Sequence, residues 1–224
     1  TELLPPLPDT PDGPLGAVAR DEAFCFYYED NLDELRRAGV RLAFFRPTRD
    51  QSLPEGTCGL YLGGGYPELH ARVLSENRAM GEAVRRAVLD GMPTLAECGG
   101  FLYLQSTLED GEGVSWPMAG VLDGAGFKTS RLQRFGYVTL TAREDSPYLK
   151  QGETVAAHEF HRWDCTRNGE LCRTRRPSGG EGWNCMVEQG NLLAGFPHLY
   201  FPSNPQFAVR FAAACRQYQE RNAL

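Results

Sequence analysis

The sequence predicts an α/β fold with a mainly parallel central sheet and an added antiparallel β region. In the first half, short apolar runs alternate with longer segments whose apolar residues recur every three or four positions, which is typical of alternating strands and helices. From about residue 114 to 175, runs rich in Gly, Thr and aromatic residues, such as 136–141, indicate antiparallel strands. The 224-residue length and 42% hydrophobic content suit one globular domain with a full core.

The elements of the first half are predicted in chain order. The expected strands are Leu15–Ala19, Arg41–Phe45, 59–62 and 93–96, and the expected helices are 24–39 and 67–90. Gly39 and Gly91 follow the two helices, where glycine commonly ends a helix. Ligands of open α/β sheets bind beyond the carboxyl ends of the strands, so the glycines at 63–65 and Cys98 are expected on one rim.

The two ends of the chain differ from its middle. Residues 1–16 contain five prolines and predict an extended tether, either an interdomain linker or a simple N-terminal tail. At the other end, the run 191–201 predicts one more strand, with His198 at a strand end, and 205–221 predicts a final helix.

Cys98 lies between a short apolar strand signal and an apolar helix signal. Gly99 and Gly100 follow it, as a sharp strand-to-helix turn around a nucleophile requires. We expect the N-terminus of the next helix to favour the thiolate and to hold an oxyanion. The competing interpretation is that Cys98 is simply a buried packing cysteine, which is the commoner role of a free cysteine.

Composition restricts the partners and the compartment. The net charge is −6 and no dense Lys/Arg stripe occurs, so neither nucleic acid nor a membrane is expected as a partner. The seven cysteines include no C-x-x-C pair, which argues against a disulfide framework and favours a reducing, cytoplasmic location.

A nucleophilic cysteine needs a base, and the chain has four histidines. His198 is the preferred base, and His70 is expected to be solvated or to cap a helix. His158 and His161 lack the spacing of a helical zinc site, so no metal is expected, and we predict a polar motif facing the rim or a partner. The string 124–130 resembles the end of a phosphate loop but has Phe127 where glycine is required, so no nucleotide site is expected.

Four blocks together resemble one known family: 24–31 (FCFYYEDN), 62–69 (LGGGYPEL), 96–100 (AECGG) and 158–161 (HEFH). The chain is similar to the C-terminal class I glutamine amidotransferase domain of cobyrinate (or hydrogenobyrinate) a,c-diamide synthases. The corresponding domains of nickel-sirohydrochlorin a,c-diamide synthases and cobyric acid synthases look similar and stay open as alternatives. The resemblance implies a flavodoxin-like three-layer sandwich.

The resemblance also implies a division of labour. Residues 17–224 would form the glutaminase, residues 1–16 the interdomain linker, and an N-terminal synthetase domain absent from this chain would bind ATP, magnesium and the corrinoid acceptor. The expected partners are therefore glutamine, that synthetase domain and, through it, the corrinoid, with no cofactor in this chain. A homodimer is left open.

The resemblance assigns roles to particular residues. Cys98 would form a glutamyl thioester and His198 would transfer protons. Backbone N–H groups of Gly64 or Gly65 and of Gly99 would stabilise the oxyanion. Three further residues are expected at the rim or at an interface: Tyr66, His158 and His161.

Two assignments are less direct. Glu97 would orient the substrate or support the turn. Class I amidotransferases usually carry Glu two residues after the catalytic histidine, but this chain has Tyr200 there. We therefore expect a Cys–His dyad. A stand-alone cysteine hydrolase on the same scaffold and a catalytically silent docking module are the alternatives from other classes.

Overall fold

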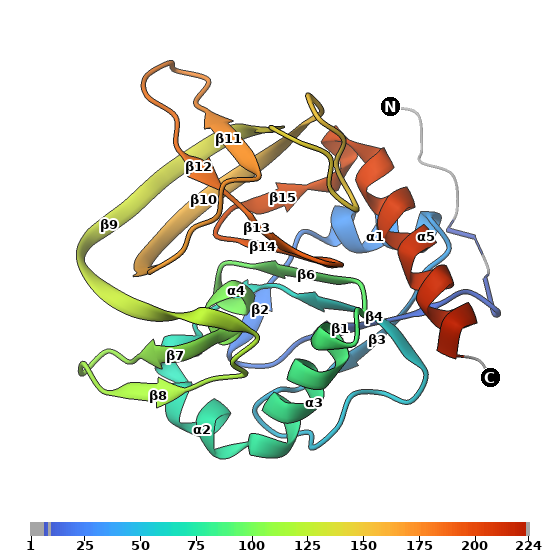
Figure 1. Cartoon of the computed structure of the whole chain (residues 1–224), viewed down its shortest axis with the longest axis horizontal. Coiled ribbons are helices and arrows are strands. Elements are labelled where there is room, and N and C mark those ends of the chain that lie inside the picture. The colour runs from blue at the N-terminus through green and yellow to red at the C-terminus, as the bar shows by residue number, and fades with distance from the viewer. Residues whose placement is uncertain (1–6, 9, 223–224) are drawn as a thin grey trace.

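The computed structural model describes residues 7–8 and 10–222, which form two large sheets, a further two-stranded sheet and several helices (Figure 1). The first sheet has the strand order β13 (Val187–Gln189), β14 (Leu192–Gly195), β6 (Thr94–Glu97), β4 (Thr57–Leu62), β1 (Leu15–Ala19) and β3 (Arg41–Phe45). Every neighbouring pair in it is parallel except β13 and β14. The predicted mainly parallel sheet is confirmed.

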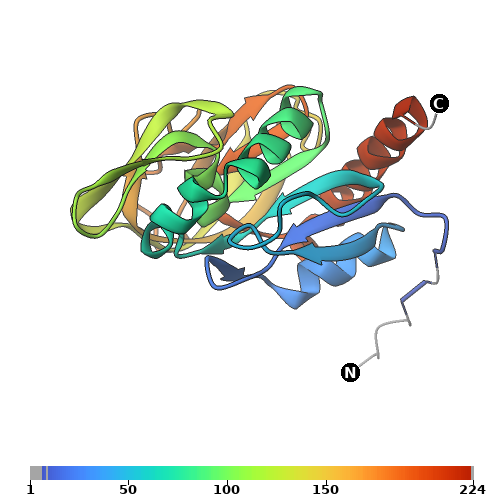
Figure 2. The same ribbon diagram turned by 90° about the horizontal axis from the view of Figure 1, so that it is seen from below.

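Helices cover both faces of the first sheet because its buried strands are apolar on both sides. One face packs against α1 (Glu29–Arg37) and α5 (Pro205–Asn222), and the other against α2 (Ala71–Glu76) and α3 (Arg78–Leu89). Figure 2 shows α1 and α3 on opposite sides of the strands. The result is the three-layer sandwich that the resemblance implies.

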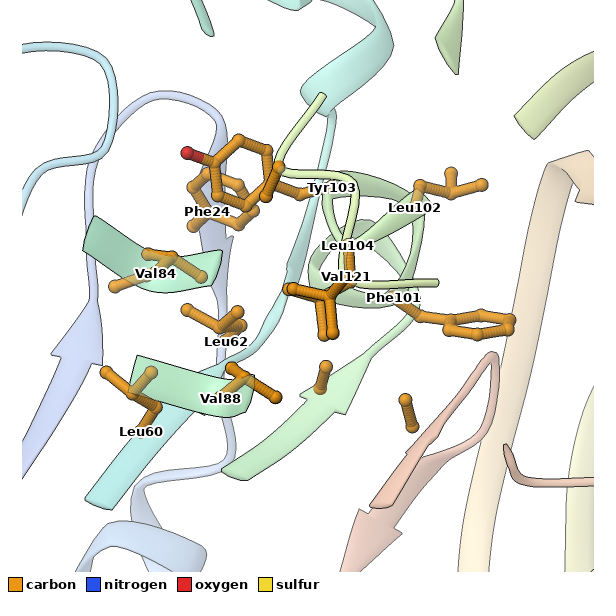
Figure 3. Packing of buried hydrophobic residues seen from close by; sticks show 14 of the residues in the cluster. Phe24, Leu60, Leu62, Val84, Val88, Phe101, Leu102, Tyr103, Leu104 and Val121 are labelled. Atoms are coloured by element: carbon orange, nitrogen blue, oxygen red, sulfur yellow. The ribbon is translucent and has the colours of Figure 1, made fainter. Parts of the chain in front are cut away.

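The alternation of side chains along β4 shows how the strands serve both layers. Leu60 and Leu62 point into the cluster that contains Val84 and Val88 of α3, as Figure 3 shows. Tyr61, between them, belongs to the cluster on the α1 and α5 face. The same cluster as Leu60 holds the helix α4 (Gly99–Tyr103), which follows Cys98.

The second sheet is the predicted added β region. Its strand order is β12 (Asn184–Cys185), β11 (Cys172–Arg175), β9 (Leu122–Ala142), β10 (Thr154–Cys165) and β15 (His198–Tyr200), and β7 (Gln105–Glu109) joins β9 and β8 (Ser115–Pro117). Neighbours are antiparallel apart from β7 with β9. The long strands β9 and β10 carry this sheet beside the rim of the first one (Figure 1).

The predicted helix 24–39 is too long at its start. Phe24–Phe26 forms β2 instead, paired with the glycine strand β5 (Gly64–Gly65). Asp21 accepts hydrogen bonds from the backbone N–H groups of Ala23 and Phe24 and so fixes the turn that enters β2. The helix begins only at Glu29, where acidic residues suit a helix N-terminus.

The predicted helix 67–90 is broken into a 3₁₀ turn, η1 (Pro67–Leu69), and the helices α2 and α3. Asn77 separates α2 from α3. Its side-chain amide donates hydrogen bonds to the carbonyls of Pro47 and Asp50, so the side chain anchors a neighbouring loop. The helical spacing of apolar residues gave no indication that Asn77 would bind a neighbouring loop and interrupt the helix.

The predicted strand 191–201 is two strands in different sheets. β14 lies in the first sheet beside β6, whereas β15 lies in the second sheet beside β10. Pro197 lies between them and has no N–H to give to a strand ladder, which ends the pairing of β14. A 3₁₀ turn, η2 (Phe201–Ser203), then leads into α5, which confirms the predicted final helix.

Residues 1–6 and 9 of the predicted linker lie outside the described residues. The last residues of the predicted linker contact the domain. The Arg41 side chain donates a hydrogen bond to the Gly13 carbonyl, and the Arg41 backbone N–H donates one to the Pro14 carbonyl. Among the described residues, the seven cysteines are free. No helix in the described ranges has the length and apolar character needed to cross a membrane.

Candidate active site

Cys98 occupies a strained turn between β6 and α4. Its backbone has φ 47° and ψ −101°, a left-handed φ that non-glycine residues seldom adopt. Two hydrogen bonds hold the turn: the Cys98 N–H donates to the Gly195 carbonyl at 2.8 Å, and the Cys98 carbonyl accepts from the Leu102 N–H at 3.0 Å. The predicted nucleophile turn is present, and the side chain is 8% exposed.

The glycines at 63–65, which follow β4, lie against this turn, which follows β6. The two segments were expected to meet at one rim of the sheet, and they do. A Cβ on Gly99 would lie 3.0 Å from the Gly65 nitrogen, so the backbone N–H groups assigned to the oxyanion are neighbours. Gly64 faces the opposite way, and a Cβ there would collide with the His198 ring. Any larger side chain at Gly64 would therefore displace the expected base.

His198 comes to the site from the second sheet. It begins β15, is directly paired with His158 of β10, and is 6% exposed. The ring of Phe26 packs edge-on against it with centroids 4.6 Å apart. His198 Nδ1 has no hydrogen-bond partner among the described residues.

Two adjoining cavities of about 220 and 210 Å³ open beside Cys98. Both are lined by Gly65, Tyr66, Cys98 and Phe160. The first adds Glu68, Leu102, His161, Arg162 and Trp163, and the second adds Cys25, Phe26, His158 and His198. Six predicted site residues thus line these two adjoining cavities: Gly65, Tyr66, Cys98, His158, His161 and His198.

The electrostatics of the site contradict one prediction. Burial raises the pKa of the Cys98 thiol to about 12, and the nearby carboxylates of Glu68 and Glu159 add to the rise, against a small opposing effect of the Gly99 N–H. The five-residue α4 does not offset this burial, so the expectation of a thiolate favoured by the helix was wrong.

His198 is uncharged in the same site. Burial lowers its pKa to about 3, and two nearby histidines, His158 and His161, lower it further. The resting pair is therefore a neutral thiol and a neutral imidazole, which can accept the thiol proton when a substrate is attacked.

Glu97 lies behind the site and does not line either cavity. Glu97 is 1% exposed, and the two oxygens of its carboxyl group accept hydrogen bonds from the Tyr61 hydroxyl at 2.9 Å and from the Leu199 N–H at 3.0 Å. Burial raises its pKa to about 8 despite these two donors. The suggested contact of Glu97 with substrate is not what the structure shows, and a supporting role agrees with it.

The two histidines of the 158–161 block have different contacts. His161 stacks on Phe196 at 3.8 Å, and its ring nitrogens engage the Trp163 carbonyl and the buried Glu159 carboxylate. His158 faces the cavity beside the exposed ring of Tyr137. The described ranges contain no group of three or more potential ligands that could hold a metal.

The string 124–130 cannot cradle a phosphate in this conformation. It lies inside β9, in extended conformation, with Gly126 paired to Cys165 of β10 and to Leu108 of β7. A phosphate loop needs a turn whose consecutive N–H groups converge on one anion, and a strand points them alternately to its two sides.

Several residues of the site were not predicted. Glu68 and Arg162 line the cavity next to Cys98, and Phe26 packs on His198. Glu68 lies within the quoted block 62–69, so its position after Tyr66-Pro67 was a usable signal. Phe26 likewise lies within the quoted block 24–31, whereas Arg162 lies outside all four blocks and reaches the cavity through the strand β10.

Comparison with known proteins decides the family. Residues 17–206 match the model of the CobB/CobQ-like glutamine amidotransferase domain. The chain belongs to this glutamine amidotransferase family. The match includes Cys98, His198 and all four blocks on which the resemblance depends.

Relatives of this amidotransferase domain include two proteins named cobyrinate a,c-diamide synthase. The one from Caldanaerobacter subterraneus subsp. tengcongensis is 41% identical over 204 residues, which cover 90% of this chain and 45% of that protein. The one from Synechococcus sp. is 42% identical over 203 residues, covering 90% and 44%. The amidotransferase domain therefore spans less than half the length of these relatives.

A solved structure of PurLQS from Thermotoga maritima shares the fold. It superimposes with a TM-score of 0.59 and 16% identity, covering 92% of this chain and 99% of that one. The class I amidotransferase architecture is confirmed.

Proposed function

We propose that this domain hydrolyses glutamine through a thioester on Cys98 and delivers ammonia to a synthetase active site. The observation that carries the proposal is the shared cavity: Cys98 in its strained turn, His198 from the second sheet and the Gly65 backbone line one space. A nucleophile, a proton acceptor and candidate oxyanion donors around one cavity are the parts that acyl transfer needs.

The reaction would start from the neutral pair. As Cys98 Sγ bonds to the side-chain amide carbon of glutamine, its proton passes to His198, and the N–H groups of Gly65 and Gly99 hold the oxyanion. His198 then gives the proton to the departing nitrogen, and ammonia leaves. Water attacks the thioester with His198 accepting its proton, glutamate is released, and the proton returns to the sulfur.

The cavity beside Cys98 suits the zwitterionic end of glutamine. Glu68 and Arg162 line it with opposite charges, and neither side chain has an ion-pair partner among the described residues. Burial raises the pKa of Glu68 to about 7, and a bound ammonium group would favour its ionised form. We therefore assign Glu68 to the α-ammonium group and Arg162 to the α-carboxylate.

The acceptor chemistry would belong to the other half of the protein. The relatives named cobyrinate a,c-diamide synthase extend well beyond the matched domain, which supports a synthetase half that uses ATP and magnesium to activate corrinoid a and c carboxylates. The partner would dock beside the cavities, where Tyr66 lines the opening and Phe135 and Tyr137 pack against His158; their side chains are 54%, 59% and 74% exposed. We assign amidation of a corrinoid, in cobalamin biosynthesis, to the whole protein.

Labelling with 6-diazo-5-oxonorleucine, a glutamine mimic, tests the proposal. The expected result is one adduct on the Cys98 peptide, prevented by excess glutamine, with ammonia release abolished in Cys98→Ser. Cys25→Ser is the matched control, because Cys25 lines the same cavity and is exposed. Labelling of Cys25 instead of Cys98, or ammonia release by Cys98→Ser, would contradict the proposed nucleophile.

A further inference from the structure

The third member of the usual catalytic triad is missing, and the structure shows what stands near His198 instead. Tyr200 occupies the position two residues later, but its hydroxyl donates to Asp30 at 2.9 Å and not to the imidazole. His198 Nδ1 has no partner in the described part of the chain. The ring is therefore oriented by its backbone and by packing on Phe26, not by a carboxylate.

The backbone next to His198 is held from both sides by buried side chains. The Leu199 N–H donates to Glu97 Oε1 at 3.0 Å, and the Leu199 carbonyl accepts from Asn31 Nδ2 at 2.7 Å. Asn31 Oδ1 also accepts from the Phe201 N–H at 2.8 Å. The peptide units that follow the imidazole are thus fixed by two side chains from the first sheet and α1.

The same carboxyl group is linked directly to the nucleophile turn. Glu97 is the residue before Cys98 and the last residue of β6. Its second oxygen, Oε2, accepts from the Tyr61 hydroxyl at 2.9 Å, and Asn31 Nδ2 lies 3.4 Å from that hydroxyl. Glu97 and Asn31 are 1% and 0% exposed, so these bonds form in a dry environment where they are strong.

We propose that Glu97, with Asn31 and Tyr61, positions His198 against Cys98 by clamping the Leu199 peptide units to the end of β6. The three side chains are called the clamp below. The clamp acts on the main chain, whereas a triad carboxylate acts on the imidazole nitrogen. This inference rests on the proposed glutaminase function and assigns positioning residues for it. None of the three touches the cavities beside Cys98.

Glutamine kinetics of clamp variants test this. Glu97→Ala removes both bonds of the carboxylate and should lower kcat by about 10- to 100-fold, the usual loss for a residue that orients a catalytic group, with little change in KM. Glu97→Gln keeps an oxygen for the Leu199 N–H and should retain kcat within about 3-fold of wild type. A general loss of structure would not produce this split between kcat and KM or this rescue.

Two further variants guard against misfolding. Asn31→Asp has the same shape but loses the donor to the Leu199 carbonyl, so it should lower kcat as Glu97→Ala does. Asn77→Ala is the control, because Asn77 also holds two backbone carbonyls from a buried position but lies away from His198. It should lower the melting temperature and leave kcat near wild type.

The outcomes separate the two proposals. Wild-type kcat retained in both folded Glu97→Ala and folded Asn31→Asp would overturn the clamp while leaving the glutaminase function intact. Equal losses in Asn77→Ala and Glu97→Ala would also overturn it, because the effect would then follow stability alone. Wild-type protein that releases no ammonia from glutamine, alone or with its synthetase half, would instead overturn the proposed function.

Discussion

At the scale of residues, the reactivity of Cys98 should reveal its buried, neutral thiol. With its pKa raised to about 12, the thiolate fraction is small at neutral pH and increases about tenfold per pH unit below the pKa. Alkylation of the Cys98 peptide by iodoacetamide, followed by mass spectrometry, should therefore accelerate steadily from pH 7 to pH 10. A rate that levels off near pH 7 would show a pre-formed thiolate.

Glu97 should make stability depend on pH in an unusual direction. Its pKa rises from 4.5 unfolded to about 8 in the folded protein, so between these values the folded state holds a proton that the unfolded state has released. The free energy of unfolding should then fall as pH rises from 5 to 8. Glu97→Gln cannot titrate, so its urea unfolding should lose less stability over that interval, by a few kcal/mol. Parallel curves for both proteins would contradict the raised pKa.

The chemistry-bearing residues were predictable to different degrees. Cys98 has a local signal, since a strand, two glycines and a helix surround it. The protonation state of Cys98 had no local signal in the sequence, because the second sheet brings distant residues such as Phe160 and His161 to the cavities beside it. Glu97 illustrates the limit: its neighbour Cys98 suggested a place in the site, but only the pairing of β15 with β10 reveals that it faces Leu199.

At the scale of elements, the two-residue strand β5 is pressed between the nucleophile turn and His198. Gly64→Ala should abolish glutaminase activity, because the added methyl group would displace the imidazole. Gly111→Ala is the control, since nothing lies within 4 Å of its added methyl group. Ammonia release and thermal melting would be measured for both. A Gly64→Ala protein with normal turnover would mean that the imidazole position is not critical.

Elements were predicted well where the periodic pattern was local. The parallel strands and α5 follow from apolar runs and helical spacing. The periodic pattern failed where a segment pairs with a strand far away in the sequence. Phe24–Phe26 is extended because it pairs with β5. The run 191–201 is divided at Pro197 into two strands that pair in different sheets. Neither partner lies within the window that a helix or strand pattern samples.

At the scale of the whole molecule, the exposed aromatic side chains at the cavity mouth define the expected contact with the synthetase half. In a protein that contains both halves, Tyr137→Asp should reduce glutamine-dependent amidation and spare amidation driven by added ammonia. Leu89→Asp is the control, because Leu89 is 53% exposed on α3, at the opposite rim of the sheet. Equal activity with both nitrogen sources in Tyr137→Asp would exclude this surface as the contact.

The switch of the chain at Pro197 has a mechanical consequence. Cys98 is attached to the first sheet and His198 to the second, so the distance between sulfur and imidazole depends on how the two sheets are aligned. His198 is joined to the long hairpin of β9 and β10 through its pairing with His158, while Glu97 and Asn31 hold the next peptide units to the first sheet and α1. The base is thus the point of the active site at which the two sheets are tied together.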